Sequence, residues 1–150
     1  MRVLFVCLGN ICRSPAAEGV VRARAPDWDT DSAGTGNWHV GEAPYPPMQK
    51  AAMQRGVDIS DLRARQFRPG DFDRFDLIVV MDNDNLEAVE RQRPMGRTTP
   101  VKLFTDFGPG GVGDIVPDPY YTRDFEGCLN LIETCADGLL LSYGTSPRRC

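Results

Sequence analysis

A cysteine and an arginine stand six positions apart near the start of the chain, in the segment 6–15, which reads Val-Cys-Leu-Gly-Asn-Ile-Cys-Arg-Ser-Pro. The planar guanidinium of Arg13 can give two parallel hydrogen bonds to a tetrahedral oxyanion. The same cation, together with the N–H groups of a curled loop, would stabilise a thiolate at Cys7. Ser14 can donate a hydrogen bond to that sulfur and make it a better leaving group. The pattern therefore predicts a cysteine nucleophile held beneath a bound phosphate.

The elements on either side of this segment would position it at the edge of a sheet. Residues 2–7 form a short apolar run rich in β-branched and aromatic side chains, which predicts a buried strand. Ser14, followed by a proline, is typical of a helix N-cap, and the predicted helix covers residues 15–24. Gly9 and Asn10 tolerate the positive φ that a curled loop needs. Because ligands of open α/β sheets bind where strands end and helices begin, we expect the anion here.

The rest of the chain continues to alternate short apolar runs with amphipathic segments. This alternation predicts a single α/β domain over residues 1–150 with three layers, a twisted four-stranded parallel sheet and helices on both of its faces. A glycine-rich flexible loop is expected at 108–113 and a frayed tail at about 145–150. Further strands are expected at 31–36, 75–81 and 101–104, and further helices at 47–55, 83–91 and 122–141.

Composition narrows the chemistry that the chain can perform. Of its 150 residues one is a histidine, His39, and five are cysteines, and the net charge is −4. A single histidine excludes sites with two or three histidine ligands, so we expect no metal and no other cofactor. The net charge gives no footprint for DNA or RNA. The odd number of cysteines excludes a complete set of internal disulfides, and neither a signal peptide nor a membrane-spanning run is recognisable, which favours reduced thiols in the cytoplasm and no membrane partner.

The segment Pro117-Asp118-Pro119 is the best source of a proton donor for such a reaction. The two prolines stiffen the loop and hold the Asp118 carboxyl in a defined direction. The tyrosines that follow, Tyr120 and Tyr121, would make the surroundings less polar and favour the protonated acid. Asp-Pro turns are also common on protein surfaces, so the motif by itself fits a rigid turn as well.

The loop and several further motifs together resemble the low molecular weight protein tyrosine phosphatases. The resemblance covers nearly the whole chain, and the motifs occur in the family's order at compatible spacings. Besides the segment 6–15, they are Asp31-Ser32-Ala33-Gly34-Thr35, Trp38-His39-Val40-Gly41, Ala64-Arg65-Gln66, Met81-Asp82 and Asp118-Pro119-Tyr120-Tyr121.

The resemblance implies a phosphotyrosine hydrolase that works through a phosphocysteine and needs no cofactor. It implies that Cys7 is the nucleophile, that Arg13 holds the phosphate and that Asp118 is the general acid and base. Implied partners are phosphate or other oxyanions and a tyrosine-phosphorylated protein, such as a bacterial tyrosine kinase or a polysaccharide-export protein. Ser32 would support the loop, and Cys12 would be a redox partner that protects Cys7 through a reversible disulfide. The implied substrate-binding set is Leu8, Gly9, Asn10, Ile11, Cys12, Ser14, Trp38, Tyr120 and Tyr121.

One departure from the family pattern and two alternative functions follow from the same residues. Leu62 stands where the family often has a histidine of a supporting network, which affects the surroundings of the loop rather than the reaction. A thioredoxin-coupled arsenate reductase shares the fold and the Cys-x5-Arg spacing but needs two more thiols. Cys128 and Cys135, two helical turns apart, fit core packing better. A non-catalytic phosphate-binding or redox-sensing module would not need Asp118, and a zinc site among the cysteines fails on their spacing.

Overall fold

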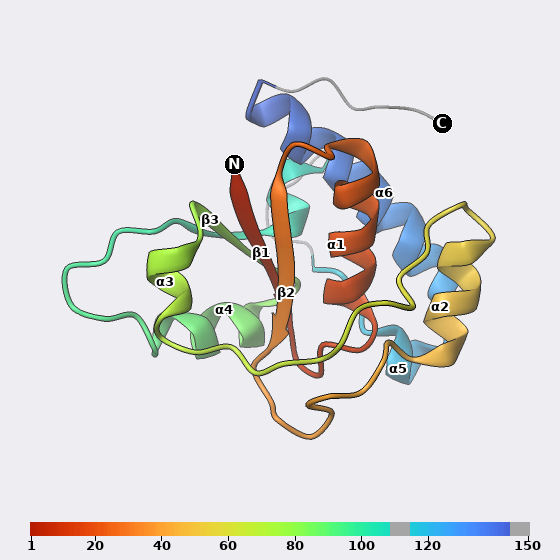
Figure 1. Ribbon diagram of the computed structural model, residues 1–150, viewed down its shortest axis with the longest axis horizontal. Helices are drawn as coiled ribbons and strands as arrows, with labels where there is room; N and C mark the ends of the chain where they lie inside the picture. The colour runs from red at the N-terminus through yellow and green to blue at the C-terminus, as the bar shows by residue number, and fades with distance from the viewer. Residues whose placement is uncertain (109–114, 145–150) are drawn as a thin grey trace.

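The computed structural model describes residues 1–108 and 115–144 and is built around a parallel sheet of four strands (Figure 1). The strands are β1 (Arg2–Cys7), β2 (Asp29–Gly34), β3 (Leu77–Val80) and β4 (Val101–Leu103). They lie in the order β2-β1-β3-β4, so the first strand of the chain is central and pairs on both sides. The predicted four-stranded parallel sheet is confirmed.

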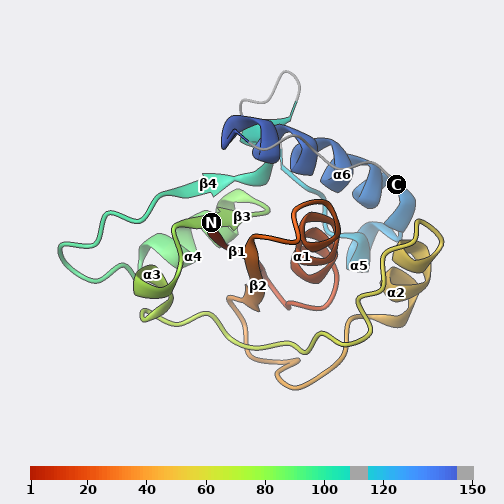
Figure 2. The same cartoon turned by 45° about the horizontal axis from the view of Figure 1, so that its top comes forward.

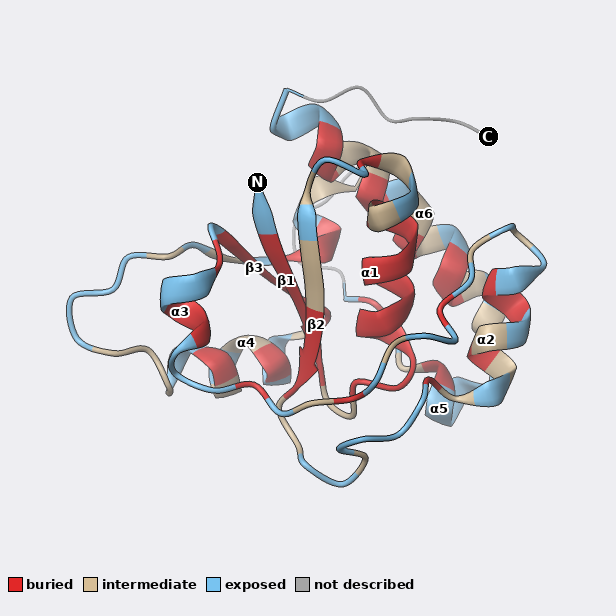
Figure 3. Ribbon diagram, viewed as in Figure 1, coloured by how far each residue is buried: buried red, intermediate tan, exposed pale blue. Residues whose placement is uncertain are grey.

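Helices cover both faces of the sheet, as predicted. Successive side chains of the central strand point to opposite faces, so both faces are apolar and both are covered. Val3 and Phe5 belong to one buried hydrophobic cluster, whereas Leu4 and Val6 belong to another, and all four are fully buried (Figure 3). The first cluster is covered by α1 (Arg13–Arg24) and α6 (Phe125–Ser142) with α2 (Pro46–Met53) beside them, and the second by α3 (Asp71–Arg74) and α4 (Asn83–Glu90) (Figure 2).

The first helix begins earlier than predicted. α1 starts at Arg13 with Cys12 at the N-cap, and the Cys12 side chain accepts no hydrogen bond from the helix. The expectation that Ser14 is the N-cap is therefore wrong, because its Oγ is engaged with the Cys7 sulfur, 3.0 Å away. The N–H groups of the first turn have no side-chain cap, which is the arrangement that an anion-binding helix end needs.

The predicted helix over 122–141 corresponds to the second of two helices, which begins three residues later than predicted. The first, α5 (Pro119–Thr122), ends at Arg123, which adopts the left-handed conformation with φ of 63°. The chain then starts α6 with Asp124 as N-cap, whose Oδ1 accepts the N–H of Gly127 at 2.8 Å. A left-handed residue cannot continue a right-handed helix, so the break separates the short α5 from the long α6.

Two short helical turns leave no pattern in the sequence. α3 and the 3₁₀ turn η1 (Phe104–Phe107) have four residues each, too few to show a helical period. The bounds of the other predicted elements differ from the observed ones by at most two residues. The predicted tail at 145–150 and most of the glycine-rich loop, 109–113, lie outside the described residues. Within the described part of the chain, no helix is both long and apolar enough to cross a bilayer.

Candidate active site

The carboxyl ends of β1 and β2 lie at the lower edge of the sheet in Figure 1. The residues that follow these ends line a pocket of about 270 Å³. The loop between β1 and α1 lines it together with the start of α5 and the segment that follows β2. This edge of an open α/β sheet is where ligands bind. The lining residues are Cys7, Leu8, Gly9, Ile11, Cys12, Arg13, Trp38, His39, Asp118, Tyr120 and Tyr121.

Cys7 ends the central strand at the base of the pocket, and its side chain is almost fully buried. Its Sγ accepts a hydrogen bond from the backbone N–H of Asn10 at 3.2 Å and lies 3.0 Å from the Oγ of Ser14. The predicted contact between Ser14 and the sulfur is thus confirmed. Donors from the backbone and from a hydroxyl surround a sulfur that also faces the pocket, an arrangement suited to holding negative charge on it.

The loop curls through Asn10, whose φ is 57°, as predicted for this residue. Gly9, which was expected to share the positive φ, does not adopt it. Its lack of a Cβ serves a close approach instead, since a Cβ there would lie 3.1 Å from the Cδ2 of His39. Gly34 at the end of β2 is needed for the same reason, because its Cβ would lie 2.8 Å from the Leu8 carbonyl oxygen. The loop is therefore held tightly against its neighbours.

Arg13 is buried and held by three partners that come from distant parts of the chain. Its Nη1 donates to the Asp82 Oδ2 at 2.7 Å and to the Val116 carbonyl at 3.0 Å, and its Nη2 lies 3.4 Å from the Asp118 Oδ2. Burial opposes the charge, but the anionic groups of Cys7, Asp82 and Asp118 outweigh it and raise the pKa of Arg13. Its Nε is buried and makes no hydrogen bond to the described residues. The guanidinium therefore has a fixed orientation and one buried donor that no described residue satisfies.

Asp118 is the N-cap of α5, and this role orients its carboxyl. Its Oδ1 accepts the N–H of Tyr120 at 3.0 Å, while its Oδ2 faces Arg13. Pro119 occupies the first helical position, which suits a proline because that N–H needs no partner within the helix. The stiff presentation predicted from the two prolines is therefore achieved by a helix cap, with one carboxyl oxygen directed towards the guanidinium.

Aromatic side chains surround the mouth of the pocket. Trp38 and Tyr121 are 69% and 72% exposed, which is unusual for such large side chains in a folded protein. Tyr120 packs against two further tyrosines, with its ring centroid 5.2 Å from that of Tyr45 and 5.5 Å from that of Tyr121. His39, predicted at the rim, lines the pocket beside Trp38. An exposed aromatic rim above an anion site fits a ligand with a flat ring.

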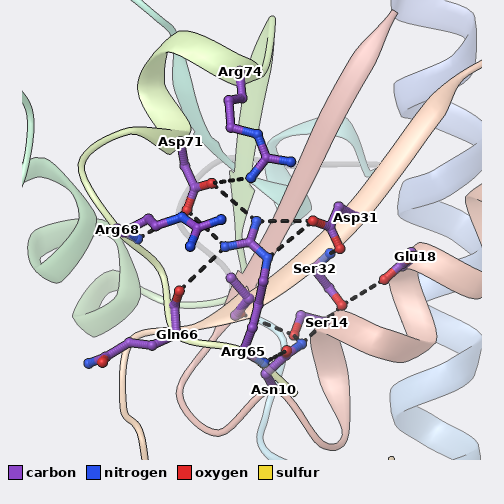
Figure 4. Close-up of polar contacts among 11 residues, drawn as sticks. Asn10, Ser14, Glu18, Asp31, Ser32, Arg65, Gln66, Arg68, Asp71 and Arg74 are labelled. Carbon is purple, nitrogen blue, oxygen red and sulfur yellow. Dashed lines mark hydrogen bonds and ion pairs between the residues drawn. The ribbon is translucent and has the colours of Figure 1, made fainter. Parts of the chain in front are cut away.

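A hydrogen-bond network lies behind the loop rather than in the pocket (Figure 4). Asn10 Nδ2 donates to the Oγ of Ser14 at 2.8 Å and to the Oγ of Ser32 at 3.0 Å, and its Oδ1 accepts the backbone N–H of Arg65 at 3.0 Å. Asn10 and Ser14, predicted among the substrate-binding residues, thus hold the loop with their side chains and are not among the lining residues of the pocket. Leu62, where the family often has a histidine, packs against the hydrophobic core, and these contacts of Asn10 form without that histidine.

The remaining described thiols are buried. Burial raises the pKa of Cys128 to about 12 and that of Cys135 to about 11. It also raises the pKa of Cys12, and the neighbouring Cys7 thiolate raises it further. Cys128 and Cys135 belong to the core cluster, as predicted. Among the residues that the structure describes, no group of histidine, cysteine and acidic side chains is arranged to hold a metal ion.

Three residues that contribute to the site were not among the predicted ones. Asp82 holds Arg13 and also caps α4, since its Oδ1 accepts the N–H of Asn85 at 2.8 Å. Its position directly after a buried strand was a usable signal. Val116 acts through its backbone carbonyl, for which a sequence carries no signal. Glu18 lies behind the loop and accepts a hydrogen bond from Ser32.

The fold and the pocket thus define an α/β protein with a cysteine, an arginine and an aspartate around one candidate oxyanion site. The sequence profile of the low molecular weight phosphotyrosine protein phosphatases matches residues 2–146, and the chain belongs to this family.

Individual relatives agree with this assignment. A low molecular weight protein-tyrosine-phosphatase of Streptomyces coelicolor is 45% identical over 93% of this chain and 91% of its own length. The crystal structure of YfkJ from Bacillus subtilis has a TM-score of 0.89 at 38% identity, over 95% of this chain and 93% of YfkJ. The structure of DARP, an arginine phosphatase of Drosophila, has a TM-score of 0.90 at 30% identity, over 97% of this chain and 99% of DARP.

Proposed function

We propose that this protein hydrolyses phosphotyrosine through a phosphocysteine intermediate on Cys7. The observation that carries the proposal is that Cys7 and Arg13 line one pocket together with Asp118, which comes from a distant part of the chain. Each has the chemistry that one part of the reaction requires: a nucleophile, a binding group for the phosphate oxygens and a proton donor.

In the first step the Cys7 thiolate attacks phosphorus, and a sulfur–phosphorus bond forms as the bond to the tyrosine oxygen breaks. Asp118 gives its proton to the departing oxygen, so that tyrosine leaves as the neutral phenol. Arg13 and the N–H groups at the start of α1 hold the remaining phosphate oxygens. The thiolate needs no separate base, which is consistent with a chain that has one histidine.

In the second step the Asp118 carboxylate accepts a proton from water as the oxygen of that water attacks phosphorus. The sulfur–phosphorus bond breaks, inorganic phosphate forms and Cys7 returns as the thiolate. The Ser14 hydroxyl, 3.0 Å from Sγ, donates to the sulfur as negative charge returns to it. The residues that the structure describes can supply every proton transfer in both steps.

The aromatic rim favours phosphotyrosine over other phosphorylated side chains. Trp38, Tyr120 and Tyr121 offer flat apolar surfaces to a phenyl ring, whereas phosphoserine is too short to reach them from the base of the pocket. Phosphoarginine is the second candidate, because the arginine phosphatase DARP has nearly the same fold. Asp118 is the one carboxylate among the described lining residues, and it already faces Arg13, so a guanidinium substrate finds no second anion among them.

The partner we propose is a tyrosine-phosphorylated protein in the cytoplasm. A bacterial tyrosine kinase or a polysaccharide-export protein remains the prediction from the family resemblance. The arsenate reductase alternative requires two further thiols near the surface, whereas Cys128 and Cys135 are buried in the core.

The test is hydrolysis of p-nitrophenyl phosphate and of phosphotyrosine, phosphoserine and phosphoarginine peptides, with Cys7→Ser as the control variant. We expect phosphotyrosine to be hydrolysed fastest and Cys7→Ser to lose turnover while still binding phosphate. Full activity of Cys7→Ser would refute the mechanism. Preference for phosphoarginine would refute the substrate, and thioredoxin-dependent arsenate reduction without ester hydrolysis would refute both.

A further inference from the structure

Glu18 is a buried acid on α1, and only 5% of its surface is exposed. Its Oε1 accepts a hydrogen bond from the Ser32 hydroxyl at 2.7 Å (Figure 4). Acidic side chains are rarely buried this deeply without a cation in contact, and no ion pair joins Glu18 to the described residues. The proposed reaction does not use this carboxyl directly, so its burial next to the candidate site calls for another role.

Glu18 stands at one end of a chain of hydrogen bonds that reaches the nucleophile. Ser32 accepts from Asn10 Nδ2 at 3.0 Å, and the same nitrogen donates to the Oγ of Ser14 at 2.8 Å. Ser14 in turn lies 3.0 Å from the sulfur of Cys7. Asn10 also contacts Cys7 directly through its backbone N–H at 3.2 Å. Three side chains therefore connect the Glu18 carboxyl to the sulfur.

The charge on Glu18 fixes the direction of the Ser32 hydroxyl. An ionised carboxylate can only accept, so the Ser32 hydroxyl must donate to Glu18, which leaves the Ser32 oxygen free to accept from Asn10. The Asn10 amide nitrogen donates to Ser32 and Ser14 in either state, and the Ser14 hydrogen is left for the sulfur of Cys7 at 3.0 Å or the Ala33 carbonyl at 3.4 Å. A protonated Glu18 needs an acceptor itself, and Ser32 is the partner within reach, so the new donor competes with Asn10 for the Ser32 oxygen and weakens the bond that holds the Asn10 amide.

We propose that Glu18 is a positioning residue of the reaction, whose carboxylate holds the Ser32 hydroxyl and, through Ser32 and Asn10, keeps Ser14 in place beside Cys7. Protonation of Glu18 loosens this arrangement and lowers the reactivity of the sulfur. The proposal rests on the function proposed above for its effect on turnover, but its effect on the thiol itself stands apart from that function.

The surroundings of Glu18 place this switch in the neutral range of pH. Burial raises the pKa of Glu18 to about 7, although the hydrogen bond from Ser32 lowers it. Asp31 on β2 and Asp61 in the segment after α2 raise it further, and Arg22 on α1 lowers it.

Arg22 is a weak partner for Glu18 because its guanidinium is already engaged. Its two terminal nitrogens each lie 3.1 Å from an oxygen of Asp61, and one of them also donates to the Asp58 carbonyl at 3.1 Å. The cation nearest in the sequence is thus committed to another carboxylate, which leaves the ionisation of Glu18 sensitive to pH.

Glu18→Gln, compared with the same substitution at the exposed Glu87, tests the proposal. Glutamine mimics the protonated acid at every pH. Two rates are measured from acidic to alkaline pH: kcat/KM for p-nitrophenyl phosphate, and alkylation of Cys7 by iodoacetamide, located by mass spectrometry. We expect the ratio of wild-type to Glu18→Gln rates to be near one at acidic pH and to rise about tenfold above neutrality, with a midpoint near pH 7. Glu87→Gln should follow the wild type throughout.

A ratio that stays constant with pH in both measurements would overturn the proposal. Absence of hydrolysis by the wild type would refute the proposed function instead, and the alkylation ratio would still test Glu18. If Glu18→Gln does not fold, Ser32→Ala interrupts the same chain and should give the same flattened profile. Asp61→Asn removes one carboxylate and frees Arg22, so it should move the midpoint to lower pH, and an unchanged midpoint would count against the proposal.

Discussion

Replacing Glu18 by glutamine should make the folded protein more stable at alkaline pH, although the same change is expected to lower its activity there. The reason is that the Glu18 carboxylate of the wild type loses its hydration when the chain folds, whereas glutamine has no charge to desolvate. The pKa of Glu18 rises from its ordinary 4.5 to about 7 in the folded protein. The folded state therefore binds a proton more tightly than the unfolded state does.

The size of the effect follows from that rise. Each tenfold change in an ionisation constant corresponds to about 1.4 kcal/mol, so the increase amounts to about 3 kcal/mol. Since the folded pKa is raised, this contribution to stability is present below pH 4.5, declines as the pH rises and is lost above about pH 7. Glutamine carries no charge at any pH, so the variant keeps the stability that the protonated Glu18 provides. The advantage of Glu18→Gln should thus grow from near zero in acid to about 3 kcal/mol in alkali, or roughly 6–12 °C in Tm.

Urea unfolding of the wild type, Glu18→Gln and Glu87→Gln, each near pH 5 and near pH 8, measures this difference directly. Glu87 is exposed, so its glutamine variant should differ little from the wild type at either pH. If the stability difference between Glu18→Gln and the wild type is the same at both pH values, Glu18 does not titrate between them. The reasoning from its burial would then be refuted.

Three other variants probe the pocket. Asp118→Ala should slow esters with poor leaving groups about a hundredfold and p-nitrophenyl phosphate much less, and an equal loss across a leaving-group series would exclude its role as the acid. Asp82→Asn keeps a good N-cap for α4 but weakens the ion pair that holds Arg13. We therefore expect kcat/KM to fall about tenfold with little change in Tm. Unchanged kcat/KM would mean that the Val116 carbonyl suffices to orient the guanidinium. Cys12→Ser should make inactivation by peroxide irreversible to thiol reductants, because no second thiol then condenses with an oxidised Cys7 to release water and form the disulfide. Equal recovery of the variant and the wild type would argue against that bridge.

The sequence predicted the structure best where a residue type at a given position has few possible structural or chemical roles. A cysteine after an apolar strand, followed by Gly-Asn, an arginine and Ser-Pro, indicated the loop that joins β1 to α1. The strands β1 and β3 were predicted for a related reason, since a parallel sheet buried on both faces produces continuous apolar runs.

The details that were mispredicted depend on contacts between distant residues. Ser14 is a residue type typical of an N-cap, but its hydroxyl contacts the sulfur of Cys7 instead. Local helix propensity cannot predict this competing contact. The break at Arg123 has no glycine to indicate it. Glu18 reads in the sequence as one polar position on a helix, and its importance comes from Ser32, fourteen positions away on a neighbouring strand.

Because the partners of Arg13 lie far along the chain, the proposed reactivity of the Cys7 loop depends on completed folding. The loop that holds Cys7 and Arg13 is finished within the first fourteen residues of the chain, but the groups that orient the guanidinium lie 69, 103 and 105 positions later. Such distant contacts form only when most of the chain has been made and has collapsed around the sheet. A nascent chain therefore carries the complete loop for most of its synthesis without a working oxyanion site. The proposed nucleophile becomes competent only when the domain that shields it is in place.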